Sequence, residues 1–308
     1  MSRALQKETT WFAVDWGTSN LRIWLMSKAD KPLKLLTSGN GMANLEPQDF
    51  EPALLALIQP YLLDNTRMKV VCCGMVGSRQ GWAEAKYFDT PCPPPSQQDA
   101  TLVHTKDPRI SVSILPGIKQ NSPADVMRGE ETQISGFLSQ HQGYSGVICL
   151  PGTHTKWVRV AAGNIVEFST FMTGELFSLL SKKSVLRHGV ETTGWDQPAF
   201  DAAIADGMEA PERIAAKLFS IRAKHLIAKQ TAEEGLSRLS GLLIGMELAA
   251  TRAHWAGHDV TIIGAASIAG LYQSALAQVN APPKVADVTR MTVLGLAKTS
   301  QTTKEPAQ

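Results

Sequence analysis

The chain has 308 residues, enough for two domains with a hydrophobic core each, and 44% of its residues are hydrophobic while 19% are charged. This balance is that of an ordinary globular protein and excludes a disordered chain. A net charge of +2 without a dense lysine–arginine run gives no indication of a nucleic-acid partner.

Hydrophobicity and cysteine usage indicate the compartment. The N-terminal residues lack the apolar core of a signal peptide, and no window approaches a membrane span. We therefore expect a cytoplasmic protein without a membrane partner. The cysteines show no C-x-x-C spacing, which predicts buried reduced thiols rather than metal ligands or disulfides. The four cysteines are Cys72, Cys73, Cys92 and Cys149.

In the first part of the chain, apolar runs and helical spacing predict strands around one helix. The strands are expected at 11–16, 21–27, 33–37, 69–73 and 111–115, and the helix at 49–63. The proline-rich segment 90–95 is predicted to be a stiff extended connector. Prolines, a glycine and an asparagine cluster at 116–128, and this cluster predicts a hinge between two halves.

The second part of the chain is predicted to be richer in helix. A helix at 129–140 precedes two strands within 147–159, and further helices are expected at 174–183, 197–206, 211–229, 232–254 and 287–298. The segment 260–266 is predicted to be a strand followed by a turn into a helix. In the segment 232–254, apolar residues recur at helical spacing. Gly241 and Gly245 would let another backbone approach this helix closely.

A short phrase occurs twice. Residues 12–24 and 147–159 each read as an apolar strand, a Gly-Thr turn and a second strand, and Gly17 and Gly152 are 135 residues apart. A tight turn can direct backbone N–H groups and hydroxyls into one concavity, which suits a phosphate. The first copy has a carboxylate, Asp15, at the strand end, whereas the second has Leu150. One acid and two phosphate turns are typical of a two-lobed phosphoryl-transfer protein.

These motifs resemble those of a known superfamily. DWGTSN (residues 15–20), LPGTHT (150–155) and IIGAA (262–266) resemble the two phosphate motifs and the adenosine motif of the sugar-kinase, actin and heat-shock-ATPase superfamily. Four longer phrases, in the expected order along nearly the whole chain, are similar to those of the 2-dehydro-3-deoxygalactonokinases. They are GMVGSRQGW (74–82), DVMRGEETQ (125–133), PGTHTKW (151–157) and MTGEL (172–176).

The resemblance implies a fold and an activity. The fold would be α/β, with two ribonuclease-H-like (actin-like ATPase) domains, 1–120 and 121–308, around a central cleft. The activity would be ATP-dependent phosphorylation of the 6-hydroxyl of 2-dehydro-3-deoxy-D-galactonate in galactonate breakdown. A kinase of another 2-oxo-3-deoxy sugar acid, an exopolyphosphatase-like hydrolase and a nucleotide-switched interaction protein are the alternatives, and a homodimer stays open.

The resemblance also implies the ATP site. Its phosphate-binding residues would be Gly17, Thr18, Ser19 and Asn20 in the first turn, and Gly152, Thr153 and His154 in the second. Gly264 and Ala265 would pass beneath the adenine, where larger side chains would clash. Asp15 would hold Mg²⁺ against the phosphates, because Mg²⁺ keeps several waters and usually takes one or two protein carboxylates.

The general base is open among three acids. In the superfamily this acid lies shortly before the second phosphate turn, where Asp125, Glu130 and Glu131 stand. A carboxylate must approach the attacking hydroxyl within about 2.6–3.2 Å to orient it and accept its proton. Glu130 is the first candidate and Asp125 the second. At least one of the three is expected only to cap the helix at 129–140, since acids favour a helix N-terminus.

Recognition of the sugar acid needs donors for a carboxylate and a 2-oxo group. Arg79 can bind a carboxylate with two parallel hydrogen bonds, and the glycines around it suit a ligand-binding loop. Ser78 and Gln80 are secondary candidates, and Arg128 would serve either substrate or phosphate. The sequence does not distinguish galacto from gluco stereochemistry.

Overall fold

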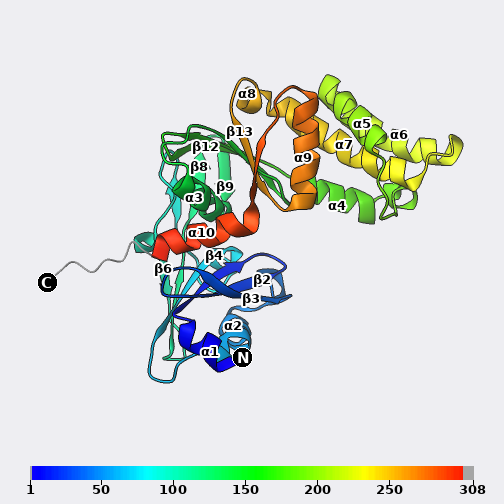
Figure 1. Cartoon of the computed structure of the whole chain (residues 1–308). Coiled ribbons are helices and arrows are strands. Elements are labelled where there is room, and N and C mark those ends of the chain that lie inside the picture. Colours follow the sequence, from blue (N-terminus) through cyan, green and yellow to red (C-terminus); the bar gives the residue numbers. More distant parts are fainter. Residues whose placement is uncertain (1, 301–308) are drawn as a thin grey trace. The chain divides into compact units, whose positions relative to one another are not determined.

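The computed structural model describes residues 2–300, and the chain divides into two compact units (Figure 1). One unit comprises Met1–Tyr144, Ala161–Glu167 and Val288–Gln308, and the other comprises Ser145–Val160 and Phe168–Asp287. Residues 121–144 thus belong to the first unit, although the sequence ranges 1–120 and 121–308 would place them in the second. Within residues 2–300, no helix combines the length and the hydrophobicity that crossing a membrane requires.

The first unit is built on a six-stranded sheet with the order β3-β2-β1-β4-β7-β6. Its strands are β1 (Trp11–Trp16), β2 (Leu21–Met26), β3 (Pro32–Ser38), β4 (Met68–Gly74), β6 (Thr101–Val103) and β7 (Ile110–Ile114). Strands β1 and β2 are antiparallel, whereas β1 and β4 are parallel, so β1 lies near the middle of the sheet. Every residue of β1 is buried, as expected for a central strand with both faces covered.

The second unit repeats this topology in a five-stranded sheet with the order β12-β11-β10-β13-β14. Its strands are β10 (Gly146–Leu150), β11 (Thr155–Ala161), β12 (Asn164–Phe171), β13 (Val260–Gly264) and β14 (Lys284–Asp287). The first two strands are again antiparallel, and the first pairs with the fourth in parallel. The predicted ribonuclease-H-like duplication is therefore confirmed at the level of strand order.

Helices cover both faces of the first sheet. Side chains of Phe12 and Val14 pack with α2 (Phe50–Ile58), whereas those of Trp11 and Ala13 pack with α10 (Val288–Ser300). The period-two alternation of the strand thus sends successive side chains to different cores. The remaining helices of this unit are α1 (Ser2–Glu8) and α3 (Glu130–Gln140).

Helices α3 and α10 make backbone-to-backbone contact (Figure 1). A Cβ atom added to Gly136 would lie 1.9 Å from the carbonyl oxygen of Met291, and one added to Gly295 would lie 1.9 Å from that of Thr132. These glycines are required for the contact, since any side chain would force the helices apart.

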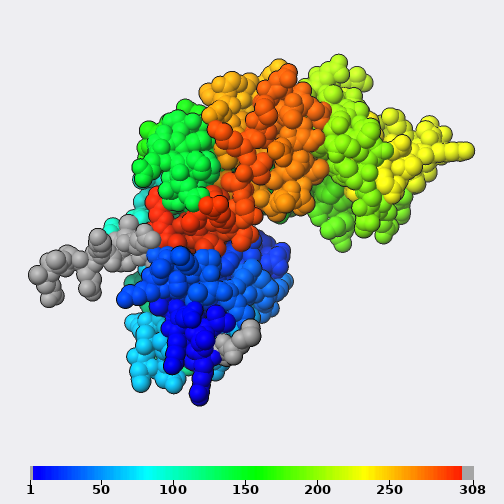
Figure 2. Space-filling model, in the orientation of Figure 1, coloured from blue at the N-terminus to red at the C-terminus, as the bar shows by residue number. Residues whose placement is uncertain are grey.

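The second unit carries most of the helices. They are α4 (Thr173–Lys183), α5 (Gln197–Glu209), α6 (Ile214–Ile227), α7 (Ala232–Ala250), α8 (Arg252–Trp255) and α9 (Ala266–Gln278). Figure 2 shows α5 and α6, coloured yellow-green to yellow, forming one end of this unit. The predicted close approach to α7 is confirmed, because a Cβ atom on Gly241 or Gly245 would come within 2.5 Å of a carbonyl oxygen of α5.

The prediction of a hinge near 116–128 is wrong. Strands β8 (Gly117–Asn121) and β9 (Ala124–Met127) form a hairpin there, and β8 also pairs with β5 (Tyr87–Asp89) in a three-stranded sheet. The turn-forming residues that suggested a hinge delimit this hairpin instead, with Pro123 in its turn and Gly117 at its first strand residue. The four cysteines are free and buried, as predicted.

Candidate active site

The turn at residues 17–20, which is predicted to bind phosphate, is held by backbone hydrogen bonds. Gly17 N donates to Asn20 O at 2.9 Å, and the turn accepts hydrogen bonds from Met42 N to Gly17 O (3.0 Å) and from Ala43 N to Thr18 O (2.9 Å). A Cβ atom on Gly41 would lie 2.4 Å from Thr18 O, so only glycine at this position allows the two backbone segments to come so close. These backbone hydrogen bonds fix the turn, while the side chains of its three polar residues, Thr18, Ser19 and Asn20, are exposed.

Asp15 lies at the end of β1, opposite Arg22 in the hairpin register, and forms an ion pair with it. The Arg22 Nη2 atom donates to Asp15 Oδ2. Burial raises the pKa of Asp15, and the charge and hydrogen bond of Arg22 lower it in part. Sequence reasoning missed Arg22, although the symmetry of a hairpin about residues 17–20 places position 22 across from position 15.

The other carboxylate oxygen of Asp15 fits a cation. Asp15 Oδ1 accepts no hydrogen bond from any residue between 2 and 300, and it faces Gly74, where a Cβ atom would lie 3.4 Å away. Across the described chain, no group of three or more His, Cys, Asp and Glu side chains could hold a metal by itself. A Mg²⁺ ion here would thus rely on one carboxylate, with waters and phosphate oxygens as its other ligands.

The start of α3 lies close to the end of β4, in the same unit. Gly74 and Gly129 both have positive φ (91° and 109°), and a Cβ atom on Gly129 would lie 3.3 Å from Gly74 Cα. The two positions require glycine because larger residues rarely adopt this conformation. Burial raises the pKa of the Cys73 thiol, and the nearby carboxylates of Asp15 and Glu131 raise it further. The structure therefore brings Asp15 and the acids of α3 to one end of the sheet.

The three candidate bases differ in environment. Glu131 is 1% exposed and turns back to accept a hydrogen bond from Gly129 N at 2.7 Å. Burial, with a contribution from Glu130, raises the pKa of Glu131 to about 8. Glu130 is half-buried, and its Oε2 accepts from Arg128 N at 3.1 Å. Asp125 lies on β9, where its Oδ1 accepts from Val126 N at 2.7 Å.

Of the four residues predicted to recognise substrate, two lie around Gly77 and two at the surface. Ser78 Oγ and Arg128 Nη1 are buried polar atoms without a hydrogen-bond partner in the described chain, and Arg128 Nη1 lies 2.9 Å from a Cβ atom built on Gly77. The Arg79 side chain is 81% exposed and lies 3.5 Å from Glu84, and Gln80 is exposed.

Arg128 is fixed by its neighbours. Its guanidinium carbon lies 4.2 Å from the centroid of the Tyr87 ring, and its Nη2 donates to Ala85 O at 2.8 Å. These contacts tie the loop after β4 to the residues just before α3. Arg128 thus combines a structural role with one unused donor, Nη1.

The turn at residues 152–154, the second one predicted to bind phosphate, is also held by backbone contacts. A Cβ atom on Gly174 would lie 2.2 Å from Gly152 O, and Glu175 N donates to Thr153 O at 2.9 Å. His154 Nε2 lies 2.6 Å from Glu175 Oε2, while Thr153 and His154 are exposed. The first turn of α4 therefore supports the second phosphate turn as residues 41–43 support the first.

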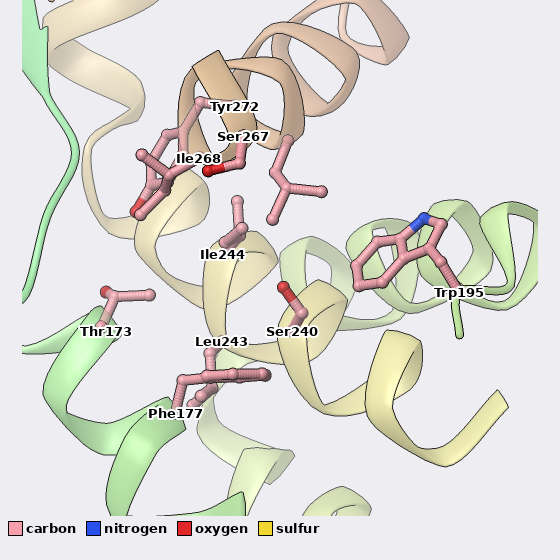
Figure 3. Close-up of a pocket in the computed structure, with 11 residues that line it drawn as sticks. Thr173, Phe177, Trp195, Ser240, Leu243, Ile244, Ser267, Ile268 and Tyr272 are labelled. Carbon is pink, nitrogen blue, oxygen red and sulfur yellow. The ribbon is translucent and has the colours of Figure 1, made fainter. Parts of the chain in front are cut away.

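A pocket opens between α4, α7 and α9 of the second unit (Figure 3). Thr173 and Phe177 come from α4, Ser240 from α7, and Ser267 and Tyr272 from α9. Most of its wall is apolar, as in most pockets that bind small molecules.

The predicted adenosine motif leads into this pocket. Gly264 ends β13 and packs on Pro151, with a built Cβ atom 3.1 Å from Pro151 Cγ. Ala265 is the N-cap of α9, and the wall begins two residues later at Ser267. The motif therefore lies beside both the second phosphate turn and the pocket.

Comparisons with known proteins decide the family. The family model described as 2-keto-3-deoxy-galactonokinase matches residues 15–299. The chain belongs to this family. It is 36% identical over 273 residues to a protein of Rhizobium meliloti (strain 1021) assigned as a 2-dehydro-3-deoxygalactonokinase, covering 86% of this chain and 88% of the relative. It is 34% identical over 269 residues to the 2-dehydro-3-deoxygalactonokinase of Escherichia coli (strain K12), with the same two coverages.

Solved structures agree with this family. A crystal structure from Sinorhizobium meliloti, assigned to a 2-dehydro-3-deoxygalactonokinase, has a TM-score of 0.86 and 34% identity, and the match covers 94% of this chain and 98% of that one. An activator of 2-hydroxyisocaproyl-CoA dehydratase from Clostridium difficile, solved with ADPNP, has a TM-score of 0.52 at 12% identity, covering 97% of this chain and 99% of that one. The second likeness concerns the fold alone.

Proposed function

We propose that this member of the 2-keto-3-deoxy-galactonokinase family transfers the γ-phosphoryl group of ATP to the 6-hydroxyl of 2-dehydro-3-deoxy-D-galactonate. Family membership supports an ATP-dependent sugar kinase of galactonate catabolism. One observation carries the assignment to residues: two equivalent turns are each seated on a glycine-containing backbone and leave their polar side chains exposed. Only the first turn has a carboxylate, Asp15, at the preceding strand end.

ATP would be held by both turns and by the pocket. The backbone N–H groups and hydroxyls of Gly17–Asn20 and of Gly152–His154 contact its phosphates. The adenine enters the pocket lined by α4, α7 and α9, next to Gly264 and Ala265. Asp15 would hold Mg²⁺, which would neutralise charge on the phosphates. Free buried cysteines and a phosphoryl donor found inside cells support a cytoplasmic location.

The acceptor would lie near the start of α3. Glu130, which is accessible and close to the end of β4, orients the 6-hydroxyl and accepts its proton. Glu131 is unsuited to this role because its carboxyl is buried and, with a pKa of about 8, is mostly protonated at neutral pH. Ser78 Oγ and Arg128 Nη1 donate to the sugar acid, with Arg79 and Gln80 at the margin of the site.

The reaction is tested by measuring ADP release from MgATP with the galacto sugar acid, its gluco epimer and inorganic polyphosphate. We expect strong stimulation by the galacto acid and a product phosphorylated at the 6-position, identified by ³¹P nuclear magnetic resonance. Preference for the epimer would assign a different sugar-acid kinase, and release of phosphate from polyphosphate would contradict the kinase assignment.

Filling the pocket should weaken ATP binding. Ser240→Phe places a ring where Figure 3 shows the Ser240 hydroxyl, and we expect the Kd for ATP to rise at least about tenfold, a loss of about 1.4 kcal/mol. Ser220→Phe, on α6 and outside the pocket lining, is the matched control. Isothermal titration calorimetry measures both variants, and unchanged affinity in Ser240→Phe would place ATP elsewhere.

Replacing Ser78, which is buried, should raise the KM for the sugar acid more than replacing Arg79, which is exposed. Ser78→Ala removes a donor that has no partner in the described protein, so we expect the KM for the sugar acid to rise about tenfold or more, as for a hydrogen bond to a charged group. The KM for ATP should not change. Arg79→Ala is expected to stay within about threefold, since exposed ion pairs contribute little. The reverse ranking in steady-state kinetics would assign recognition to Arg79.

A further inference from the structure

A buried carboxylate lies at the centre of the second unit, on α7, and no sequence motif drew attention to it. Glu247 is 1% exposed. Its Oε1 accepts from Trp157 Nε1 at 2.7 Å, and its Oε2 accepts from Tyr272 OH at 2.8 Å and from Thr173 Oγ1. The three donors come from β11, α9 and α4, so this one side chain connects three elements to α7.

Two of these donors belong to the pocket. Thr173 and Tyr272 line it from α4 and α9, as Figure 3 shows. Thr173 is also the residue before Gly174, whose backbone is in contact with Gly152 of the second phosphate turn. The pocket wall and the support of the phosphate turn therefore share one hydrogen-bond acceptor.

The network also reaches the phosphate turn from its other side. Tyr272 OH lies 3.0 Å from Thr155 Oγ1, and Thr155 directly follows His154. The turn at 152–154 is thus flanked by two threonines, Thr155 and Thr173, and both connect to Glu247, one directly and one through Tyr272.

Such an acceptor is costly to bury. Burial raises the pKa of Glu247 to about 7, although all three donors lower it. Cys149 and Tyr272 are the other titratable groups that interact with this carboxylate. Apolar side chains of similar volume often pack such a core at no loss of stability, so stability alone does not account for a buried carboxylate. Three directional hydrogen bonds to one carboxylate restrict the positions of the Trp157, Tyr272 and Thr173 side chains relative to α7.

We propose that Glu247 is a positioning residue for ATP, which fixes the pocket wall and the second phosphate turn in one mutual geometry. This inference rests on the proposed placement of ATP in the pocket and on the turn. It implies that loss of the acceptor weakens nucleotide binding without changing the affinity of the folded protein for the sugar acid.

The network is tested by variants that remove one partner at a time. In Glu247→Gln, we expect the Kd and the KM for ATP to rise about tenfold, while the KM for the sugar acid changes by less than about twofold. Tyr272→Phe leaves Glu247 and the ring in place and should raise the same constants. If Glu247→Gln does not fold, Tyr272→Phe and the matched pair Thr173→Val and Thr173→Ser decide the question. Thr173→Ser keeps the donor and should lie closer to wild type than Thr173→Val.

The control is another buried carboxylate with a purely local role. Glu51 accepts hydrogen bonds from the backbone N–H groups of Lys106 and Asp107, in the first unit. Glu51→Gln should lower the melting temperature without altering the Kd for ATP. If Glu247→Gln and Tyr272→Phe behave like Glu51→Gln, Glu247 is merely structural and the inference fails. If Ser240→Phe also leaves ATP binding intact, the placement of ATP has failed instead.

Discussion

Asp15→Asn is expected to lower kcat by about 10²–10³-fold, with the KM for the sugar acid changed by less than about threefold. Asparagine keeps the volume of the side chain but removes the charge that would hold Mg²⁺ against the phosphates. The loss should fall on the transferring group, where charge is redistributed in the transition state, rather than on sugar-acid binding. Steady-state kinetics at saturating magnesium measures both constants.

The ion pair with Arg22 requires a control. Asparagine also leaves the Arg22 guanidinium without its carboxylate, so a folding defect has to be separated from a catalytic one. Arg22→Gln breaks the same pair and keeps Asp15, and we expect a smaller loss of kcat from it. Circular dichroism checks that both variants are folded. Near-normal turnover in a folded Asp15→Asn protein would remove Asp15 from the proposed metal site.

Glu130→Gln is expected to lower kcat by about 10²–10⁴-fold, the usual contribution of a general base. The amide can still orient a hydroxyl but cannot accept its proton. Glu130 is half-buried at the start of α3, and glutamine keeps the volume of its side chain, so we expect the variant to fold. Single-turnover measurements with saturating ATP isolate the chemical step.

The neighbouring acids provide matched controls. Glu131 is mostly protonated at neutral pH, so Glu131→Gln changes little in charge and should keep most of the turnover. Asp125→Asn, on β9, should also stay near wild type. A large loss confined to Asp125→Asn would make Asp125 the base, and equal losses in all three variants would indicate a structural requirement.

Much of the fold could be predicted because it depends on local patterns. The apolar run of β1 and the alternation of apolar and polar residues in β2 and β11 predict the two hairpins. The 135-residue offset between Gly17 and Gly152 indicates the duplication. The hairpin at 117–127 was not predicted, because prolines and glycines mark the turn of a hairpin and a hinge equally well. Strand β14 is short and mostly exposed, and so has no apolar run to reveal it.

The site could be predicted only where a residue and its motif are contiguous. The turns and Asp15 belong to such phrases. By contrast, Glu247 meets Trp157 and Tyr272 across 90 and 25 residues of sequence, and no local pattern distinguishes it from a solvated acid on a helix. Arg79 shows the opposite case: its loop has the composition of a binding loop, yet the arginine is exposed while the adjacent Ser78 is buried.

The contact between α3 and α10 has a consequence for biosynthesis. Helix α10 is the last described element of the chain, but it belongs to the unit that contains β1. A ribosome releases the N-terminal strands first, so α3 and one face of β1 remain uncovered until residues 288–300 have been synthesised. The first unit therefore cannot complete its core before α10 is made, and a chain shortened before residue 288 would expose that apolar face to chaperones and proteases.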